Sequence, residues 1–359
     1  MHFLIVKTSS LGDILQAFPA LDWLRQRFPE AQIDWVVERS FSELVASHPA
    51  VNRVLTVDTR RWRQALAHSA VWKEIRSWRK QVRETGYDVA FDLQANVKSG
   101  LLLSQVRAQQ KVGFGGKSAR EWFNVFFTHK RIDPDPHGNI RNDYLRVVQS
   151  VWGVSEAQPA GKSLFRITGE QQAQVAELVQ AVQTKILVCP GAFWRNKQLP
   201  VEAWIDLLQR IENAHFLLAW GNDAERQMAE QMHAALANRS QIIPKLPLAV
   251  LQHLMAQVDL VLAMDSLPLH LCGTTATPSF SVFGPSSAAK FAPEGVQHRT
   301  VQGSCPYGRT FVKRCPILRT CKTGACIRSL EGAYLFDAFK SRADQDQCGS
   351  ARFQSPSPP

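Results

Sequence analysis

Short apolar segments alternate with longer stretches of mixed polar and apolar residues from the start of the chain. Residues 2–7 (HFLIVK) form the first apolar segment, a polar turn (SSLGD) follows, and a helical pattern then extends through about Phe28. Two further apolar segments, IDWVV at 33–37 and VLTV at 54–57, have another helical stretch between them. The pattern predicts a βαβαβ opening, which is typical of a parallel sheet covered by helices.

The same alternation continues through the first half of the chain. The predicted elements are a charged helix at 70–85, a strand at 87–94, an apolar segment at 97–106, a short strand at 111–114 and a helix near 144–152. The segment VSEAQPAGKS (154–163) then has the polar, turn-forming composition of a linker. We therefore expect a first domain over residues 1–155.

A second series of strands and helices begins after this linker. Its predicted strands lie at 185–191, 215–221, 241–244, 259–265 and 279–285, with helices at 169–182, 201–211, 223–236 and 248–258 and one more helix before the last strand. A chain of 359 residues is long enough for two domains of about 150 residues each. We expect an α/β protein with two Rossmann-like lobes, 1–155 and 163–335, a cleft between them, and a disordered tail at 340–359.

The charge of the chain narrows the kind of partner that it meets. Lys and Arg number 42 and Asp and Glu 31, so the formal net charge is +11. Such an excess attracts anionic partners, whether nucleic acid, a lipid surface or a phosphorylated substrate. Basic residues alternate with Trp62, Trp72 and Trp78 over residues 60–83, a combination that favours contact with a membrane surface.

Cysteine usage and hydropathy indicate where in the cell the protein is located. No stretch approaches the roughly 20 apolar residues that span a bilayer, and the first residues lack the pattern of an export signal. Seven cysteines are an odd number, which argues against a disulfide framework, and Cys189 and Cys272 lie in apolar contexts typical of a core. We expect a cytoplasmic protein that is peripherally associated with a membrane surface.

The first candidate site follows the first predicted strand. In parallel sheets ligands bind beyond the carboxyl ends of the strands, where helix N-termini present N–H groups. Ser9, Ser10, Gly12 and Asp13 lie at such an end and offer hydroxyls, backbone amides and one carboxylate. The same residues also fit a capping box, which would stabilise the helix without any chemistry. The residues alone leave both interpretations open.

Two strand ends of the second lobe carry further candidates. Arg195 and Lys197 follow the strand at 185–191, where Lys can serve a diphosphate as a point charge and Arg as a fork. Glu225 follows the strand at 215–221. Its carboxylate either accepts hydrogen bonds from ribose hydroxyls or caps the next helix, and by itself the cap is the simpler interpretation.

A third strand end, after residues 259–264, presents Asp265, Ser266 and His270. Pro268 in the first turn marks a helix N-terminus whose positive dipole end faces the expected cleft. The alternative is an ordinary N-cap beside a packed histidine.

Two familiar patterns are not followed. Gly116-Lys117-Ser118 resembles the end of a phosphate-binding loop, but the residue five positions before Gly116 is Lys111 and not glycine. Asp133-Pro134-Asp135 has the D-x-D form of a metal-holding pattern, yet it follows no clear strand end, so we interpret it as a turn.

Four cysteines, Cys305, Cys315, Cys321 and Cys326, crowd into a short segment near the end of the second lobe. Thiolates are good zinc ligands, but structural zinc sites usually show tighter cysteine spacing than most of this segment has. Reduced thiols in a loop rich in proline and glycine are the preferred interpretation, and no metal is expected at the candidate sites.

Several longer motifs carry a resemblance to a known family. They are LIVKTSSLGDILQAFPALDWL, DWVVE, TRRWRQ and SAREW in the first lobe, and PGAFWRNKQLPVEAW, AWGNDAER, DLVLAMDSLPLHL and SVFGP in the second. In this order they resemble the heptosyltransferases of glycosyltransferase family nine over most of residues 1–300. The resemblance implies a GT-B fold and an inverting, metal-independent transfer without cofactor. ADP-heptose would bind the C-terminal lobe and Kdo-lipid A the N-terminal lobe.

The resemblance also implies a role for each candidate residue. Asp13 would be the general base that deprotonates the acceptor hydroxyl, with Ser10 beside it on the acceptor side. The donor would be bound by Lys197 at the diphosphate, Glu225 at the ribose, and Asp265, Ser266 and His270 on the heptose and phosphate side. The anionic acceptor would be bound by Arg60, Arg61, Arg63 and Arg120.

The chain departs from the family pattern at the donor side. Phe193 and Trp194 stand where small hydroxyl residues are common, and Leu267 replaces a glycine near Asp265. These departures keep two alternatives open. In the first, the enzyme transfers another sugar, or uses another acceptor such as the one that receives a second heptose. In the second, the protein is a catalytically silent module that binds a nucleotide sugar. A nucleic-acid partner is not expected, because no reading motif accompanies the charge.

Overall fold

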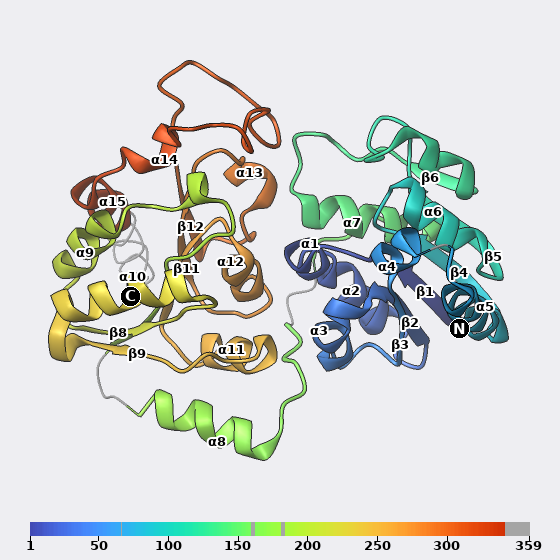
Figure 1. The fold of residues 1–359 in the computed structure, drawn as a ribbon, viewed down its shortest axis with the longest axis horizontal. Helices are drawn as coiled ribbons and strands as arrows, with labels where there is room; N and C mark the ends of the chain where they lie inside the picture. The colour runs from blue at the N-terminus through green and yellow to red at the C-terminus, as the bar shows by residue number, and fades with distance from the viewer. Residues whose placement is uncertain (66, 159–161, 181–183, 342–359) are drawn as a thin grey trace, which may run out of the picture.

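The computed structural model describes residues 1–65, 67–158, 162–180 and 184–341, which fold into two lobes (Figure 1). Each lobe holds a six-stranded sheet, in the order β3-β2-β1-β4-β5-β6 in the N-terminal lobe and β12-β11-β10-β7-β8-β9 in the C-terminal lobe. Every strand pairing in the two sheets is parallel. The expected two Rossmann-like lobes of a GT-B fold are therefore confirmed.

The strands are short and mostly buried on both faces, as the near-continuous apolar runs predict. The N-terminal strands are β1 (His2–Val6), β2 (Gln32–Glu38), β3 (Arg53–Val57), β4 (Tyr87–Asp92), β5 (Ala108–Phe114) and β6 (Lys130–Ile132). The C-terminal strands are β7 (Thr184–Cys189), β8 (Ala214–Leu218), β9 (Ser240–Ile242), β10 (Leu260–Met264), β11 (Ser279–Phe283) and β12 (His298–Gln302).

Helices connect successive strands in both lobes. Those of the first lobe are α1 (Leu11–Leu15), α2 (Phe18–Arg27), α3 (Ser42–Ser47), α4 (Thr59–Gln64), α5 (Ser69–Glu84), α6 (Val97–Ser104) and α7 (Ile140–Gln149), with 3-10 turns η1 (Arg39–Phe41), η2 (Trp122–Phe127) and η3 (Ser150–Trp152). Those of the second are α8 (Gly169–Leu178), α9 (Val201–Arg210), α10 (Asp223–Leu236), α11 (Leu248–Met255), α12 (Leu267–Cys272), α13 (Ala288–Phe291), α14 (Ala325–Arg328) and α15 (Gly332–Lys340), with η4 (Arg195–Lys197) and η5 (Ala237–Arg239).

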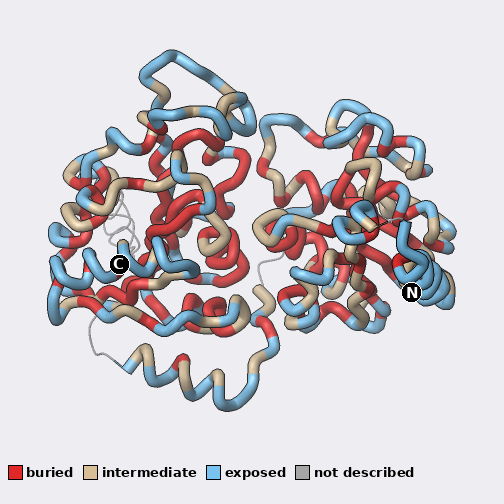
Figure 2. The backbone as a smooth tube through the Cα atoms, viewed as in Figure 1, coloured by how far each residue is buried: buried red, intermediate tan, exposed pale blue. Residues whose placement is uncertain are grey.

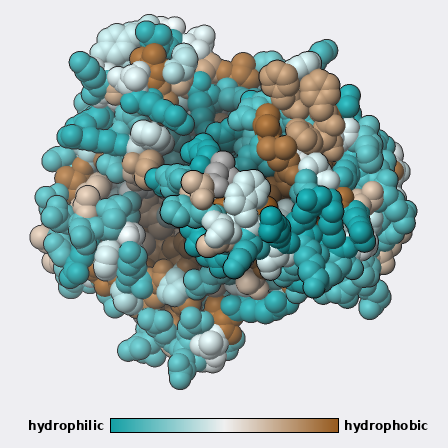
Figure 3. Space-filling view, turned by 45° about the vertical axis from the view of Figure 1, so that its right-hand side comes forward, coloured by the Kyte–Doolittle hydropathy of each residue, from teal (hydrophilic) through white to brown (hydrophobic). Residues whose placement is uncertain are grey.

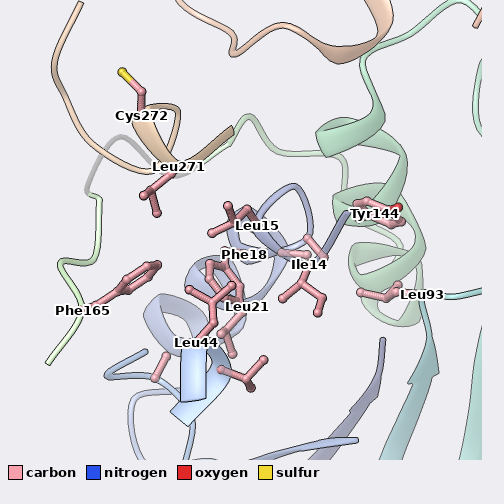
Figure 4. Close-up of a cluster of buried hydrophobic side chains, with 14 of the residues drawn as sticks. Ile14, Leu15, Phe18, Leu21, Leu44, Leu93, Tyr144, Phe165, Leu271 and Cys272 are labelled. Atoms are coloured by element: carbon pink, nitrogen blue, oxygen red, sulfur yellow. The ribbon is translucent and has the colours of Figure 1, made fainter. Parts of the chain in front are cut away.

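The largest apolar cluster crosses from one lobe to the other. Strands at the centre of each sheet are buried, whereas outer helices and the upper loops are exposed (Figure 2). At the junction, Leu271 of α12 lies beside Leu15 and Phe18 of the N-terminal lobe, and Phe165 reaches the same cluster from the connecting segment (Figure 4). The Phe18 and Phe165 rings meet edge to face, with centroids 5.7 Å apart. Apolar packing thus joins the two lobes next to α1.

Three details differ from the sequence-based expectations. The helix expected to run through about Phe28 is divided into α1 and α2, because Pro19 lies in the first turn of α2 and lacks the N–H of a helix interior. The D-x-D sequence does follow a strand, since β6 ends at Ile132. Its carboxylates accept loop hydrogen bonds, Asp133 from the Ser118 N–H at 2.8 Å and Asp135 from the His137 N–H at 2.9 Å.

The expected tryptophan surface is also corrected. Trp62 and Trp78 are only 8% and 5% exposed, and their rings pack edge to face against one another beneath α4 and α5. Trp72 is exposed at 45%. Apolar burial outweighs interfacial placement here, because both indoles complete the core between β3 and α5.

Helix α15 extends to Lys340, and the expected tail at 342–359 lies outside the described residues. Among residues 1–341, apart from the short gaps, no helix is long and apolar enough to cross a membrane.

Candidate functional site

The candidate residues meet where the carboxyl ends of the two central strands face each other. Helix α1 follows β1, helix α12 follows β10, and these two helices pack together across the lobes. In each lobe the first strand lies between the second and the fourth, so that neighbouring connections diverge and leave a crevice at that end of the sheet. The site is therefore built from both lobes.

Asp13 lies in the first turn of α1, half-buried beside the end of β1. Its Oδ2 accepts hydrogen bonds from the backbone N–H and the hydroxyl of Ser10, at 3.2 and 3.0 Å. Burial alone would raise the pKa of Asp13, but the charge of Lys7, the Ser10 bonds and the charge of Arg314 bring that pKa below its ordinary value. Asp13 is consequently a carboxylate at neutral pH, with Oδ1 not used in the bonds to Ser10.

Lys7 is a second ionisable group at the end of β1 that the sequence analysis missed. Its side chain is buried, and Nζ donates to the hydroxyl of Tyr144 at 3.0 Å. Burial lowers the pKa of Lys7 to about 8, although the carboxylates of Asp13 and Asp92 oppose this shift. The signal in the sequence was a lysine that directly ends an apolar strand, a position where a solvated charge is unusual.

His270 brings the C-terminal lobe against the turn that carries Asp13. A Cβ built on Gly12 would lie 3.0 Å from Cδ2 of His270, so the glycine allows this close approach. The amide nitrogen of Gln16 lies 3.1 Å from Nε2 of His270. Burial and the charge of Arg141 lower the pKa of His270 to about 3, against the opposing effect of Asp265. The imidazole is therefore neutral at physiological pH.

Lys197 and Asp265 form a largely buried ion pair behind His270. The Lys197 Nζ lies 2.5 Å from Asp265 Oδ2, and His270 Nε2 lies 3.9 Å from Asp265 Oδ1. Burial would raise the pKa of Asp265, but the charge of Lys197 lowers it below the usual range. Ser266 is the N-cap residue of α12, as expected from the proline in its first turn. Lys197, which follows β7, and Asp265, which follows β10, thus lie together behind the ring of His270, which contacts the turn that carries Asp13.

Glu225 lies in the first turn of α10, at the neighbouring strand end. Its Oε2 accepts a hydrogen bond from the Gly221 N–H at 2.7 Å, while Asn222 caps the helix by accepting from the Glu225 N–H at 3.0 Å. A Cβ on Gly191 would come within 2.2 Å of the Glu225 carboxylate. The capping role therefore belongs to Asn222, and the Glu225 carboxylate lies over the end of β7.

The acceptor-side arginines lie at the same edge of the N-terminal sheet. Arg60, Arg61 and Arg63 are exposed on α4, where Arg61 pairs with Glu74. Arg120 is exposed on the loop before η2, and its charge contributes to lowering the pKa of Lys7. Arg120 thus acts on a residue beside Asp13, whereas Arg60, Arg61 and Arg63 lie on the helix that follows β3, two strands away from β1.

Two further arginines were missed because only the tertiary structure brings them to the site. Arg141 of α7 is buried between the lobes, where its guanidinium donates to the carbonyls of Phe291 and Ala292 at 3.1 and 2.9 Å. Arg314, from the cysteine-containing segment, stacks over the Phe291 ring and helps to lower the pKa of Asp13. Neither lies in a motif or at a strand end.

The departures at the donor side do not fill the site. Phe193 is 90% exposed, and its ring contacts that of Trp194, which packs under the guanidinium of Arg319. Trp194, Arg195 and Arg319 border a pocket of about 290 Å³ beside η4. One of the two arguments for a silent module was that Phe193 and Trp194 close the donor site. The exposed position of Phe193 and the packing of Trp194 on Arg319 do not support that argument.

The cysteines in the described part of the chain fall into two groups. Cys189 and Cys272 are buried core residues. Cys305, Cys315, Cys321 and Cys326 line one small pocket and form no disulfide. Within the described ranges, no group of three or more His, Cys, Asp or Glu side chains is arranged to hold a metal ion.

Known proteins share both the sequence and the fold. Residues 75–320 match the family model described as glycosyltransferase family 9 (heptosyltransferase). Lipopolysaccharide heptosyltransferase 1 of Pseudomonas aeruginosa is 32% identical over 80% of this chain and 79% of its own length. The Escherichia coli K12 protein of the same name is 29% identical over 80% of this chain and 88% of its own.

Solved structures agree with these relatives. The structure of E. coli heptosyltransferase WaaC with ADP has a TM-score of 0.72 and 25% identity, covering 85% of this chain and 94% of that one. E. coli ADP-heptose lps heptosyltransferase II, at 17% identity and a TM-score of 0.69 over 97% and 100% of the two chains, shares the fold. With a parallel two-lobed architecture, a site at the facing strand ends and this family match, the chain belongs to glycosyltransferase family 9.

Proposed function

We propose that this protein transfers heptose from ADP-L-glycero-D-manno-heptose to the Kdo residue of Kdo-lipid A, in the inner core of lipopolysaccharide. The transfer inverts the anomeric centre and needs no metal ion or cofactor. Membership of family 9 and relatives named lipopolysaccharide heptosyltransferase 1 support the reaction class. The acceptor follows from those relatives together with the exposed arginines of the N-terminal lobe.

One observation carries the proposal, namely the meeting of an ionised carboxylate from one lobe with a buried lysine–aspartate pair from the other. Gly12 and His270 are in contact, which brings the Asp13 turn against the Lys197–Asp265 pair. A displacement at a sugar carbon needs a base on the attacking side and a stabilised leaving group on the other. The two lobes supply one each.

The proposed step follows from these positions. Asp13 accepts the proton of the acceptor hydroxyl, whose oxygen forms a bond to the anomeric carbon of heptose. The bond from that carbon to the diphosphate oxygen breaks, and ADP leaves with the electron pair. Lys197 supplies positive charge to the diphosphate, while Glu225 binds the ribose hydroxyls. Asp265, Ser266 and the neutral His270 position the heptose and phosphate side.

The acceptor side uses the remaining cations. Ser10 holds the orientation of Asp13, and Arg60, Arg61, Arg63 and Arg120 face the carboxylate and phosphate groups of Kdo-lipid A. Because such an acceptor is anchored in a bilayer, we further propose that the protein works in the cytoplasm, in peripheral contact with the inner membrane.

The test is incubation of purified protein with ADP-heptose and Kdo-lipid A in the presence of EDTA, followed by mass spectrometry of the acceptor. A gain of one heptose is expected, and Asp13→Asn should lower kcat roughly 10² to 10⁴-fold while ADP-heptose binding persists. A gain only on an acceptor that already carries heptose would replace the proposed acceptor by the second-heptose alternative. Failure to bind ADP-heptose would favour the silent module.

A further inference from the structure

Three aromatic side chains of the 3-10 turn η2, in the N-terminal lobe, are exposed to solvent. Trp122, Phe123 and Phe126 are 56%, 61% and 65% exposed, and each ring contacts the other two, with centroids 5.1 to 6.4 Å apart. We call these three residues the aromatic ridge. Figure 3 shows hydrophobic side chains gathered at the upper right, over the N-terminal lobe. A contiguous exposed apolar cluster of this kind marks an interaction site.

The inner face of the same turn is held tightly by both polar and apolar contacts. Asn124 is fully buried, and its Nδ2 donates to Asp92 Oδ2 at 2.7 Å and to the Asn96 carbonyl at 2.8 Å. Phe127 packs so closely on α6 that a Cβ on Gly100 would overlap its ring. The inward packing of Asn124, Val125 and Phe127 therefore fixes η2 against the lobe and leaves the three rings of the ridge outside.

Cations and the acceptor side of the site adjoin the ridge. Lys117 and Arg120 are exposed on the loop that leads into it, and Trp122 lies over Gly116 of that loop, 3.4 Å from where a Cβ would be. The charge of Arg120 also reaches Lys7 and Tyr144 beside Asp13. One short loop therefore connects the ridge with the catalytic edge of the lobe.

We propose that the aromatic ridge inserts into the surface of an anionic phospholipid bilayer, with Lys117 and Arg120 at the headgroups. Aromatic rings suit the membrane–water interface, and each basic residue near an anionic surface adds attraction. The placement beside Asp13 rests on the proposed function, since a lipid-anchored acceptor presents its sugar to the cleft only if the cleft edge meets the bilayer. The buried Trp62 and Trp78 cannot serve this purpose.

The experiment is flotation of the full chain with vesicles of phosphatidylethanolamine and phosphatidylglycerol. The double variant Phe123→Ser/Phe126→Ser should lower the vesicle partition coefficient roughly tenfold or more, because two exposed rings no longer leave water. Tyr334→Ser, an equally exposed aromatic of α15 in the other lobe, is the matched control and should float like the wild type. Higher salt, or vesicles of phosphatidylcholine alone, should weaken binding of the wild type.

A spectroscopic measurement locates the contact without changing the surface much. Brominated acyl chains should quench part of the tryptophan fluorescence of the wild type, and Trp122→Phe should remove that quenching while flotation persists. Quenching that is retained in Trp122→Phe would overturn the assignment of the ridge.

Other outcomes separate the ridge from its alternatives. Unchanged flotation of the double variant, or loss of flotation in Trp72→Ser alone, would overturn the proposal and move the contact to α5. A wild type that is dimeric by light scattering, with a monomeric double variant, would make the ridge a contact between two copies instead.

Transfer to a soluble, deacylated acceptor should be the same in wild type and double variant. Absence of transfer there would refute the proposed function without bearing on the flotation result.

Discussion

Among its neighbours, the buried Lys7 contributes most to keeping Asp13 charged. Lys7 is the strongest of the groups that lower the pKa of Asp13, and it opposes the effect of burial. Lys7 can do so at neutral pH because its own pKa, about 8, still leaves most of it protonated. The base of the proposed reaction is therefore a pair of residues, one that accepts the proton and one that keeps it ionised.

Lys7→Met should accordingly move the acidic limb of the pH profile of kcat/KM. Without the lysine charge, burial raises the pKa of Asp13, so the limb should shift to higher pH by roughly 1 to 3 units. The sign follows because Asp13 acts in its deprotonated form, which a higher pKa makes scarcer at acidic pH. Lys98→Met, which removes the half-exposed partner of Glu38, is the control and should leave the limb in place. A profile of Lys7→Met that superimposes on the wild type would contradict this dependence.

At the scale of elements, glycines decide how closely strand ends and helices approach. The absence of a Cβ at Gly12 of α1 allows the His270 ring to pack against the backbone. In the same way, Gly191 after β7 leaves room for the carboxylate of Glu225 from α10. In both places a side chain from one element occupies the volume that a Cβ would need. Donor-side geometry is thus set by backbone at least as much as by the polar residues themselves.

Gly191→Ala should weaken donor binding with little loss of stability. The new methyl group would lie 2.2 Å from the Glu225 carboxylate, whose flexible side chain can rotate away. Loss of the proposed hydrogen bond between Glu225 and the ribose should raise the KM for ADP-heptose roughly tenfold, which corresponds to one hydrogen bond to a charged group. Gly169→Ala, in a helix with no atom near the added Cβ, should leave KM unchanged. Equal KM values for both variants would remove Glu225 from the donor site.

At the scale of the whole molecule, the two lobes are joined by polar groups as well as by apolar packing. Lys290 of α13 and Asp143 of α7 form a buried ion pair with Nζ 2.6 Å from Oδ2. Arg141 and Asn139 from the same region bond to the carbonyls that follow α13. The relative placement of Asp13 and Lys197 rests on this junction, because no covalent element other than the connecting segment links the lobes.

Removing one partner of this pair should be costly. Lys290→Met leaves the Asp143 carboxylate buried without its counter-ion, and we expect unfolding to require about 3 to 5 kcal/mol less free energy in urea titrations. The double variant Lys290→Met/Asp143→Leu should recover most of that loss, since no unpaired charge remains buried. Arg210→Ala, which breaks an exposed pair within α9, should cost less than about 1 kcal/mol. A single variant as stable as Arg210→Ala would show that the junction does not depend on the pair.

The sequence by itself determined the two α/β lobes, the strand ends and the residues placed there. Periodic apolar segments specify which elements form, and in parallel sheets the carboxyl ends of strands are the sites of ligand binding. Asp13, Lys197, Glu225 and Asp265 could therefore be named as candidates, because each lies in the loop or the first helical turn that follows a strand. The family motifs added roles to residues that pattern alone left equally suited to helix capping.

Only the tertiary structure decided which residues act together. Lys7 is close to Asp13 in the sequence, but only the fold shows that its side chain is buried, and Arg141 and Arg314 lie outside every motif. These residues influence Asp13 or His270 through charge. The burial of the aromatic residues could not be predicted from the sequence either, since Trp62 and Trp78 are buried in the core while the aromatic ridge is exposed. Local pattern fixes the period of an element, but exposure and pKa depend on what the rest of the chain packs against it.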